Sequence, residues 1–562
     1  MSVLERTTDF LVIGSGGGGL LASIAARRAG ADVLVLEKQE TVGGNTGLSG
    51  GTMWIPDNPL MRAEGIADSA EEAIAYLDAA VGEPTVASSA ARKAVYVAEL
   101  QRMFSFLVAL GFPLVRVRGY PDYYDTLPGG NAQGRVVQCD FFDLRQLGPH
   151  QERVVNPPVP LIASVREAPE ICMALRSSHA ALTLGRVVAR TAAARLQHRP
   201  LVANGAALVG RLLQAAFRTG VDIWTECPVE ELLIDKDVVS GVRARRRGVD
   251  LTVRARHGVL IACGGYARNE ELRRRFGRQP SSQEWTMANL GETGEVIEQA
   301  IAIGAATALM DEGIWMPMSL SPSGPLYNVY ERAQPHAIIV NGDGRRYVDE
   351  AATYMAVGQA MYDEQQRTGR GIPSWIVIDS RHRRHYPWGL QPPGLTPKSW
   401  FSSGYMKRAG SIAELAGQCQ IEPANLEQTV ASFNRFAAAG VDEDFHRAES
   451  AYGRFFGDPR NRPNPGLGTI ERPPFYAVAL YPGDLGTFGG ILTDEHARVL
   501  RQDGSTIDGL YATGTATAPV TGRTYPATGS SIGGTMVWGF AAAQHALGRL
   551  GGLEREPVAA EH

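Results

Sequence analysis

Long hydrophobic runs are absent from this sequence. No stretch of 18 uncharged apolar residues occurs, so we expect no helix that spans a bilayer. The first apolar run leads directly into a glycine loop, which is not the pattern of a signal peptide. The chain also has no long run of Lys and Arg, and its formal net charge is −4. We therefore expect no nucleic-acid partner, because such a partner requires a concentrated basic surface.

Cysteine is scarce and scattered. The five cysteines are odd in number, and none forms a CxxC pattern or a Cys/His spacing suited to a metal. This favours a reduced, cytoplasmic setting and a protein without a bound metal. Apolar and charged residues are present in ordinary measure, at 44% and 20% of the chain. A chain of 562 residues is longer than a domain with one compact core usually is, so we expect two or more domains.

Glycine is abundant at the N-terminus, where the pattern predicts a dinucleotide-binding unit. DFLVIG (9–14) is typical of a buried parallel strand, GSGGGG (14–19) contains GxGxxG, and LLASIAARRAG (20–30) has helical spacing. DVLVLE (32–37) is a second strand that ends on an acid. The glycines allow a tight turn, close approach of a pyrophosphate and packing of the helix on the strand. Glu37 would then accept a hydrogen bond from the adenosine ribose.

A second glycine-rich segment follows that acid and distinguishes FAD from NAD. Residues 43–51 are mostly Gly, Ser, Thr and Asn, which lets backbone amides follow a longer cofactor. A nicotinamide domain would usually continue into another βαβ unit here. Together with later strand–glycine segments (226–235, 258–269, 508–518) and a small-residue helix (529–547), the pattern resembles the fumarate-reductase-like FAD-binding family.

That resemblance implies FAD, held by a Rossmann-like α/β domain into which a catalytic α+β lid is inserted. We expect a discontinuous FAD-binding domain (1–284 and 446–562), a catalytic domain (285–445) and a helical excursion at 145–205. Between 157 and 199, apolar and Arg residues recur at roughly helical spacing. Such helices would pack on the domain, on a second subunit or on a membrane surface, and the sequence leaves these alternatives open.

The resemblance also implies which residues contact FAD. They come from all the segments named above: Gly14, Ser15, Gly16, Gly17, Gly18, Gly19, Glu37, Lys38, Gly43, Gly44, Asn45, Thr46, Ser49, Gly50, Gly51, Val229, Ala262, Gly264, Gly265, Gly514, Ser531 and Ile532.

Within this family, several stretches resemble the 3-ketosteroid dehydrogenases, especially those that act on the Δ1 bond. The similarity covers nearly the whole chain and is weakest at 145–205. It rests on SGGTMWIP (49–56), GYPDYYDTLPGG (119–130), GVDEDFHRAESAYGRFFGDP (440–459), PFYAVALYPGDLGTFGGILTD (474–494) and GRTYPATG (522–529).

This resemblance implies a catalytic set of three tyrosines and a glycine. Tyr525 and Gly529 match a pair four apart in the C-terminal loop, Tyr123 matches the tyrosine of a PDYY stretch, and Tyr354 follows an RRY strand end. Hydrogen bonds from the Tyr525 hydroxyl and the Gly529 amide to a C3 ketone would stabilise an enolate as it forms. Tyr354, with a pKa lowered by hydrogen bonding to Tyr123 and by the local field, would remove the C2 proton. A hydride from C1 would pass to the flavin.

Alternatives remain at each level. Tyr120 and Tyr124 are close enough to Tyr123 for that assignment to shift, and the sequence identifies neither the steroid, the electron acceptor nor the oligomeric state.

Rival functions are a fumarate-reductase-like enzyme, a 3-ketosteroid Δ4-(5α)-dehydrogenase and a flavin relay protein without turnover. The diacid enzyme would need an arginine where Tyr354 stands. The Δ4 enzymes have a serine two positions after the loop tyrosine, where this chain has Ala527.

The remaining predictions concern departures and residues without a catalytic role. The loop after Tyr525 lacks a second proline before the matched glycine, and Glu292 stands where an NTGD-like motif has asparagine. We expect both departures on the substrate side. We expect Tyr347 to be a strand-end core residue, and His336 and His446 to be structural.

Overall fold

The computed structural model describes residues 4–155 and 160–548, so the predictions that fall on 157–159 lie outside the described residues. Its first sheet has the strand order β20-β21-β11-β1-β2-β8, extended by a β9–β10 hairpin on β11. The central strands run parallel, as the apolar N-terminal runs predict. Their bounds are β1 Leu4–Ile13, β2 Val33–Leu36, β8 Asp222–Trp224, β9 Val229–Asp235, β10 Val238–Arg246, β11 Val249–Ile261, β20 Arg498–Leu500 and β21 Thr506–Ala512.

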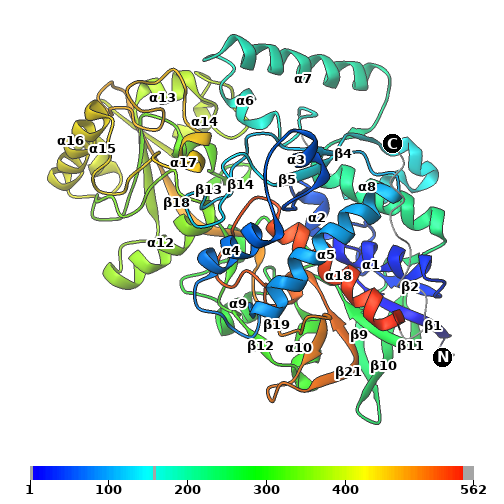
Figure 1. The fold of residues 1–562 in the computed structure, drawn as a ribbon. Helices are drawn as coiled ribbons and strands as arrows, with labels where there is room; N and C mark the ends of the chain where they lie inside the picture. The colour runs from blue at the N-terminus through cyan, green and yellow to red at the C-terminus, as the bar shows by residue number, and fades with distance from the viewer. Residues whose placement is uncertain (1–3, 156–159, 549–562) are drawn as a thin grey trace.

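Helices cover this sheet on one face and enclose a large apolar core. They are α1 (Gly17–Arg28), α5 (Ala90–Ala109), α8 (Asn204–Thr219) and α18 (Ser530–Gly548), and Figure 1 shows α1, α5 and α18 close together. On the other side, a second core joins β9, β10 and α10 (Glu295–Ala302). The first and last parts of the chain therefore share one sheet, which is the fold predicted for the FAD-binding domain.

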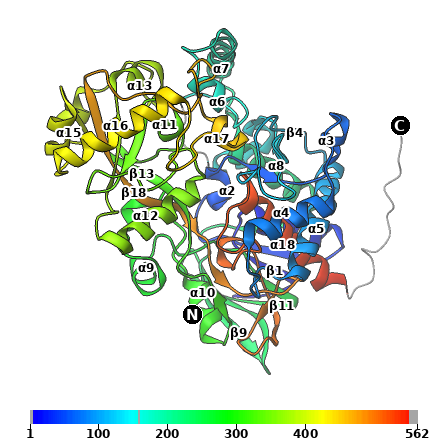
Figure 2. The same cartoon turned by 60° about the vertical axis from the view of Figure 1, so that its left-hand side comes forward.

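A second sheet forms the other half of the molecule, with the order β14-β13-β18-β16-β15 and β17 added to β18. Helices α12 (Tyr354–Thr368), α15 (Ile412–Gln418) and α16 (Pro423–Ala439) flank it, at the side of the molecule away from α1 (Figures 1 and 2). The strands are β13 Gly313–Ser321, β14 Gly324–Tyr327, β15 Ala337–Val340, β16 Ser374–Ile378, β17 Met406–Ala409 and β18 Phe475–Thr487.

Strand β18 lies beyond the expected boundary at residue 445. It pairs with β13, β16 and β17, so the chain returns to the first sheet only at β20. Residues 446–487 read as part of the cofactor domain in the sequence because strand membership depends on partners far away in the chain. The division into a discontinuous FAD-binding domain and an inserted catalytic domain stays a prediction.

The segment at 145–205 contains helices α6 (Ala168–Cys172) and α7 (Ser178–Leu196). Helix α7 lies along the rim of the molecule in both views (Figures 1 and 2). Its outward side chains include Leu182, Val188 and Leu196, which are 53%, 48% and 83% exposed. Among the helices of the described ranges, none is both long and apolar enough to span a bilayer.

Candidate active site

The turn between β1 and α1 has the conformation that its glycines predict. Gly14 has φ +100°, and a Cβ there would lie 2.4 Å from Ala262 O on the neighbouring strand end. A Cβ on Gly19 would lie 2.2 Å from Gly14 O, so the helix packs on the turn only without a side chain. At Gly16 the nearest atom is 3.8 Å away, in Thr46, which leaves the backbone open. A ligand can therefore approach the backbone at Gly16, whereas the Gly14, Ser15 and Gly17 amides already donate to Leu36 O, Glu37 and Thr46.

The acid at the end of β2 is tied to the same turn. Glu37 Oε2 accepts hydrogen bonds from Ser15 N at 3.0 Å and from Ser15 Oγ at 2.5 Å, while Oε1 accepts from Gln39 N at 2.9 Å. Thr46 Oγ1 accepts from Gly17 N at 3.0 Å, which joins the second glycine segment to the first turn of α1. The two predicted glycine motifs thus form one continuous surface.

The second glycine segment approaches helix α8 closely. Gly43 precedes α2 (Gly44–Leu48) with φ +119°, and Ser49, Gly50 and Gly51 connect α2 to β3 (Thr52–Trp54). A Cβ on Gly51 would lie 2.4 Å from Asn204 C, so only glycine fits between β3 and the start of α8. This close packing fixes the path of the backbone that we expect beside the flavin.

Residues predicted to hold the adenosine end gather near Glu37. Cys227 N donates to Glu37 O at 2.9 Å, which brings the start of β9, with Val229, beside the end of β2. Lys38 Nζ forms an ion pair with Glu295 Oε2 at 3.2 Å. The Lys38 side chain is therefore paired with the first residue of α10.

The C-terminal motif meets the N-terminal one across a close helix contact. A Cβ on Gly18 would lie 2.5 Å from Thr535 O, and one on Gly539 would lie 2.3 Å from Gly18 O. Helices α1 and α18 therefore cross with their backbones in contact. Nearby, Gly514 begins the turn η3 (Gly514–Ala516), Ser531 and Ile532 lie in the first turn of α18, and Ala262, Gly264 and Gly265 follow β11.

Tyr123, Tyr354 and Tyr525 come from three distant segments and share one buried cluster. The ring centroids of Tyr123 and Tyr354 lie 5.4 Å apart, edge to face. The Tyr525 ring lies 5.6 Å from Tyr354 and 6.0 Å from Tyr123. Met316 and Phe488 belong to the same apolar cluster. The structure thus brings together the three tyrosines that the sequence predicts to act together.

Backbone contacts hold the loops that carry two of these tyrosines. Tyr123 lies between β4 (Leu114–Arg116) and β5 (Val136–Cys139), and Tyr123 N donates to Pro526 O at 2.8 Å. Tyr76 Oη donates to Pro526 O at 2.5 Å and accepts from Tyr124 N at 3.2 Å. The Tyr123 loop and the Tyr525 loop are therefore fixed to each other. Of the adjacent tyrosines, it is Tyr123 whose ring contacts both Tyr354 and Tyr525.

Gly529 ends the Tyr525 loop in a conformation that requires glycine. Its φ is +88°, and a Cβ would lie 2.7 Å from Thr52 C. Its carbonyl accepts from Trp54 N at 3.3 Å. No acceptor in the described part of the chain bonds the Gly529 N–H. Tyr525 Oη is 2.8 Å from Ser531 Oγ, and Ser531 lies two residues after Gly529 in the chain.

Burial makes all three phenols weak acids in the protein alone. It raises the pKa of Tyr354 well above 10, and neighbouring Tyr525 adds to the effect. It also raises the pKa of Tyr123 well above 10 and that of Tyr525. The sequence-based expectation of a lowered pKa for Tyr354 is therefore wrong for this structure. Hydrogen bonding to Tyr123 lowers the pKa of Tyr354, as expected, but burial outweighs this effect.

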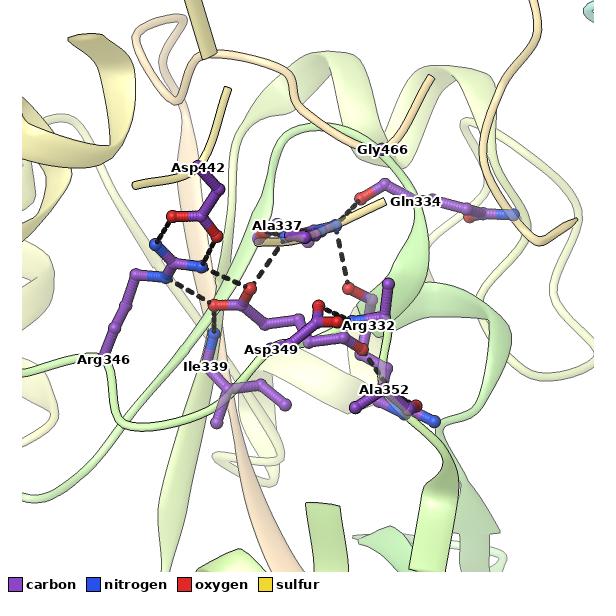
Figure 3. A network of polar contacts seen from close by, with 12 residues as sticks. Arg332, Gln334, Ala337, Ile339, Arg346, Asp349, Ala352, Asp442 and Gly466 are labelled. Carbon is purple, nitrogen blue, oxygen red and sulfur yellow. Dashed lines mark hydrogen bonds and ion pairs between the residues drawn. The ribbon is translucent and has the colours of Figure 1, made fainter. Parts of the chain in front are cut away.

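A buried ionic network holds the loop that precedes Tyr354. Glu350 accepts from Arg346 Nε at 2.8 Å and from Arg447 at 3.2 Å, and these cations keep its pKa below the usual range although burial opposes them. Arg346 also pairs with Asp442 at 2.7 Å, and the pair is seen in Figure 3. Arg332 donates to the carbonyls of Glu350 and Ala352. The residues before α12 are therefore anchored, which fixes the start of the helix at Tyr354.

Sequence reasoning missed two aromatic neighbours of the tyrosines. The Tyr452 ring lies 4.6 Å from Tyr123, and its hydroxyl is buried without a partner in the residues that the structure describes. Phe488 lies 5.6 Å from Tyr525. Both belong to stretches quoted above, 440–459 and 474–494, where aromatic residues beside glycines were the available signal.

Glu292 is buried beside the second glycine segment. Its carboxylate accepts from Asn45 and Thr515. That this departure lies on the substrate side stays a prediction.

Residues expected to be structural have ordinary partners. Tyr347 Oη is 2.6 Å from Ser374 Oγ, His336 Nδ1 is 2.8 Å from Thr469 O, and His446 pairs with Glu449. Within residues 4–155 and 160–548, no group of three or more His, Cys, Asp or Glu side chains is placed to hold a metal ion.

Comparison with known proteins identifies the family. The family described as "FAD binding domain" matches residues 9–532. The chain is 38% identical to a 3-oxosteroid 1-dehydrogenase of Mycobacterium tuberculosis, over 97% of this chain and 99% of that protein. It is 33% identical to a 4-oxocyclohexanecarboxylate 2-dehydrogenase of Sinomonas cyclohexanicum, over 99% and 96%.

A solved structure agrees closely. The 3-ketosteroid Δ1-dehydrogenase of Sterolibacterium denitrificans, in complex with 1,4-androstadiene-3,17-dione, is 33% identical and superposes with a TM-score of 0.91, covering 97% of this chain and 100% of that one. The chain therefore belongs to the FAD-binding domain family of flavoproteins, and within it to the family of the 3-oxosteroid 1-dehydrogenases. Its cofactor is FAD.

The residues present suit this cofactor. Helix α1 has no acidic residue in its first turn and no side-chain cap from Gly16, so the positive end of its dipole favours a phosphate there, although Gly17 N already donates to Thr46 Oγ1. Helix α18 also has no acid in its first turn. Glu37 ends β2, where an acid suits a ribose hydroxyl.

Proposed function

We propose that this protein is an FAD-dependent 3-oxosteroid 1-dehydrogenase, which introduces a double bond between C1 and C2 of a 3-ketosteroid. The observation that carries the proposal is the convergence of Tyr123, Tyr354 and Tyr525 in one buried cluster, with the Gly529 amide at the end of the same loop. The predicted contact residues on the glycine turns, Glu37 and the start of α18 would hold the cofactor.

Each residue has a distinct task in this reaction. The Tyr525 hydroxyl and the Gly529 N–H would donate hydrogen bonds to the C3 carbonyl oxygen, which stabilises the negative charge that develops there. Tyr354 would take the proton from C2, and Tyr123, in ring contact with it, would pass that proton onward. When bound, FAD supplies the acceptor for the hydride that leaves C1. The apolar surroundings of the tyrosines exclude water from the enolate.

The site favours a neutral ketone over a dicarboxylate. A fumarate-type substrate needs cationic partners for two carboxylates. The buried Arg332 and Arg447 near this site already donate to backbone carbonyls and to Glu350. The tyrosine cluster is otherwise lined by apolar side chains. Ala527 in the C-terminal loop favours 1,2-desaturation over the Δ4 reaction.

The experiment that tests this function is an anaerobic half-reaction. The holoenzyme, with its flavin oxidised, is mixed separately with four possible electron donors, and the flavin absorbance is followed. They are androst-4-ene-3,17-dione; a 5α-reduced 3-ketosteroid; succinate; and 4-oxocyclohexanecarboxylate. We expect rapid bleaching with the first steroid and a Δ1 product by mass spectrometry. Unchanged absorbance with all four compounds would identify a relay protein, and bleaching only by 4-oxocyclohexanecarboxylate would assign the activity to that smaller ketone.

We further propose that 157–199 lets the protein rest on a membrane surface. Exposed Leu182, Val188 and Leu196 on α7 support this, together with Arg186 on the same exposed side. We expect the enzyme to sediment with anionic lipid vesicles, and the double variant Leu182→Ser and Leu196→Ser to stay in the supernatant. The matched control exchanges two exposed leucines elsewhere, Leu390 and Leu395. Equal sedimentation of both variants contradicts the proposal.

A further inference from the structure

The loop that carries Tyr525 is held to the core of the first sheet on both sides of this residue. Thr524 Oγ1 donates to a carbonyl near the end of helix α4 (Ala70–Val81) at 2.9 Å. Tyr76 Oη, from the same helix, donates to Pro526 O at 2.5 Å. The buried side of α4 belongs to the large apolar core of the first sheet. These contacts hold the loop from one side.

Arg523 holds the same loop from the other half of the molecule. Its Nη1 and Nη2 atoms donate to the two carboxylate oxygens of Asp311, at 2.9 Å each, and Nη1 also pairs with Glu312. A two-pronged pair of this kind fixes direction as well as distance. Arg523 O accepts from Gln359 Nε2 at 2.9 Å. Asp311 and Glu312 directly precede β13 and Gln359 lies in α12, so Arg523 joins the loop to the second sheet.

Glu312 is the buried centre of these contacts. Its side chain is fully buried. In addition to the pair with Arg523, Arg278 Nη2 donates to Oε1 at 2.7 Å and Trp315 Nε1 donates to Oε2 at 2.8 Å. A buried carboxylate with several donors is a rigid anchor, because displacing a donor leaves part of the charge unpaired. Arg278 and Trp315 lie outside the loop, so this anchor does not depend on Arg523 for its partners.

Glu312 also holds a ring that packs on Tyr525. Glu312 O accepts from Phe488 N at 2.8 Å, and the Phe488 ring lies 5.6 Å from that of Tyr525. Glu312 therefore supports Tyr525 through its side chain, by way of Arg523, and through its backbone, by way of Phe488. The Tyr525 hydroxyl has to reach the ketone together with the Gly529 N–H, and a misplacement of about 1 Å costs roughly a hundredfold in rate.

We propose that Arg523 is a positioning residue for the reaction: its ion pairs with Asp311 and Glu312 hold the Tyr525 hydroxyl where it donates to the C3 ketone. The inference rests on the proposed function and adds a residue to it. The Arg523 side chain is 48% exposed and acts through Tyr525, not on the steroid. Because Asp311 and Glu312 precede a strand of the second sheet, the geometry of the donor pair depends on how the two sheets are held together.

A double-mutant cycle tests whether Arg523 acts through the Tyr525 hydroxyl. Single-turnover flavin reduction by saturating androst-4-ene-3,17-dione is measured for the wild type, Arg523→Gln, Tyr525→Phe and the double variant. We expect Arg523→Gln to reduce the rate about tenfold to a hundredfold with unchanged flavin content. The double variant should be no slower than Tyr525→Phe, because the hydroxyl that Arg523 positions is already absent. Arg523→Lys, which keeps the charge, should recover part of the rate.

Either of two results overturns the proposal: Arg523→Gln with the wild-type rate, or a double variant whose loss is the product of the two single losses. A general loosening of the fold would give the second result. The matched control is Arg498→Gln, which breaks the ion pair of Arg498, in β20, with Asp494 at 2.6 Å, and it should reduce its flavin as the wild type does. If Arg523→Gln does not retain FAD, Asp311→Asn, which weakens the same ion pair, replaces it in the cycle.

The infrared C=O stretch of bound 1,4-androstadiene-3,17-dione reports the hydrogen bonds to the ketone without turnover. We expect the C3 band at lower frequency in wild-type and Arg498→Gln holoenzyme than in an apolar solvent, and closer to the solvent value in Arg523→Gln. Equal bands in Arg523→Gln and the wild type overturn this inference alone. A wild-type band at the solvent position contradicts the proposed function as well, so the two failures are distinguishable.

Discussion

The Tyr525→Phe enzyme should retain FAD and lose about a hundredfold to a thousandfold of its rate of flavin reduction, the usual effect of removing one donor from an oxyanion site. The substitution removes only the hydroxyl, which is 2.8 Å from Ser531 Oγ. The ring keeps its contacts with Tyr354 and Phe488, so packing of the cluster is preserved. The loss should appear in single-turnover reduction by androst-4-ene-3,17-dione, with unchanged flavin content.

A matched substitution separates this effect from a general loss of a phenol. Tyr476 lies in β18 and packs in the second sheet, away from the tyrosine cluster. Tyr476→Phe should reduce its flavin at close to the wild-type rate. A Tyr525→Phe enzyme that matched it would mean that the ketone is polarised by another donor.

The N-terminal cofactor unit could be predicted in detail because its signals are local. The turn at Gly14, the start of α1 after Gly16 and the acid Glu37 each follow from spacing within about 25 residues. The membership of β18 could not be predicted, because that strand is defined by partners more than 60 residues away. Apolar alternation indicates a strand but does not say which sheet receives it.

The candidate site, too, could be predicted only in part from the sequence. Motif resemblance located Tyr525 and Tyr354, but it did not separate Tyr123 from Tyr124. The structure separates them because successive side chains leave the backbone in different directions, and here the Tyr123 ring meets Tyr354. The pKa of Tyr354 was predicted in the wrong direction, since burial, which raises it, depends on the whole cluster. Sequence alone shows which residues carry a phenol and not how deeply each is buried.

Replacement of Tyr354 by Phe should abolish the exchange of the C2 proton of the steroid with solvent deuterium. Exchange requires a base and does not require hydride transfer, so it isolates this step from oxidation. In the Tyr525→Phe enzyme, exchange should be slowed but still measurable, because its base is intact. Tyr476→Phe provides the control, since Tyr476 packs in the second sheet away from the tyrosine cluster. Exchange in Tyr354→Phe at the wild-type rate would mean that another group is the base. The buried Tyr452 hydroxyl would be the next candidate.

The pH dependence of exchange shows whether the base is a tyrosine. Tyr354 acts as a base only when ionised, and burial holds its pKa well above 10. Over pH 7 to 9 the ionised fraction therefore grows by about tenfold per pH unit, and the exchange rate of the wild type should grow with it. A rate that is flat over this range would require a base with a pKa below 7, which no member of the tyrosine cluster provides. Because any loss of FAD at alkaline pH would also lower activity, the exchange rate should be measured per bound flavin.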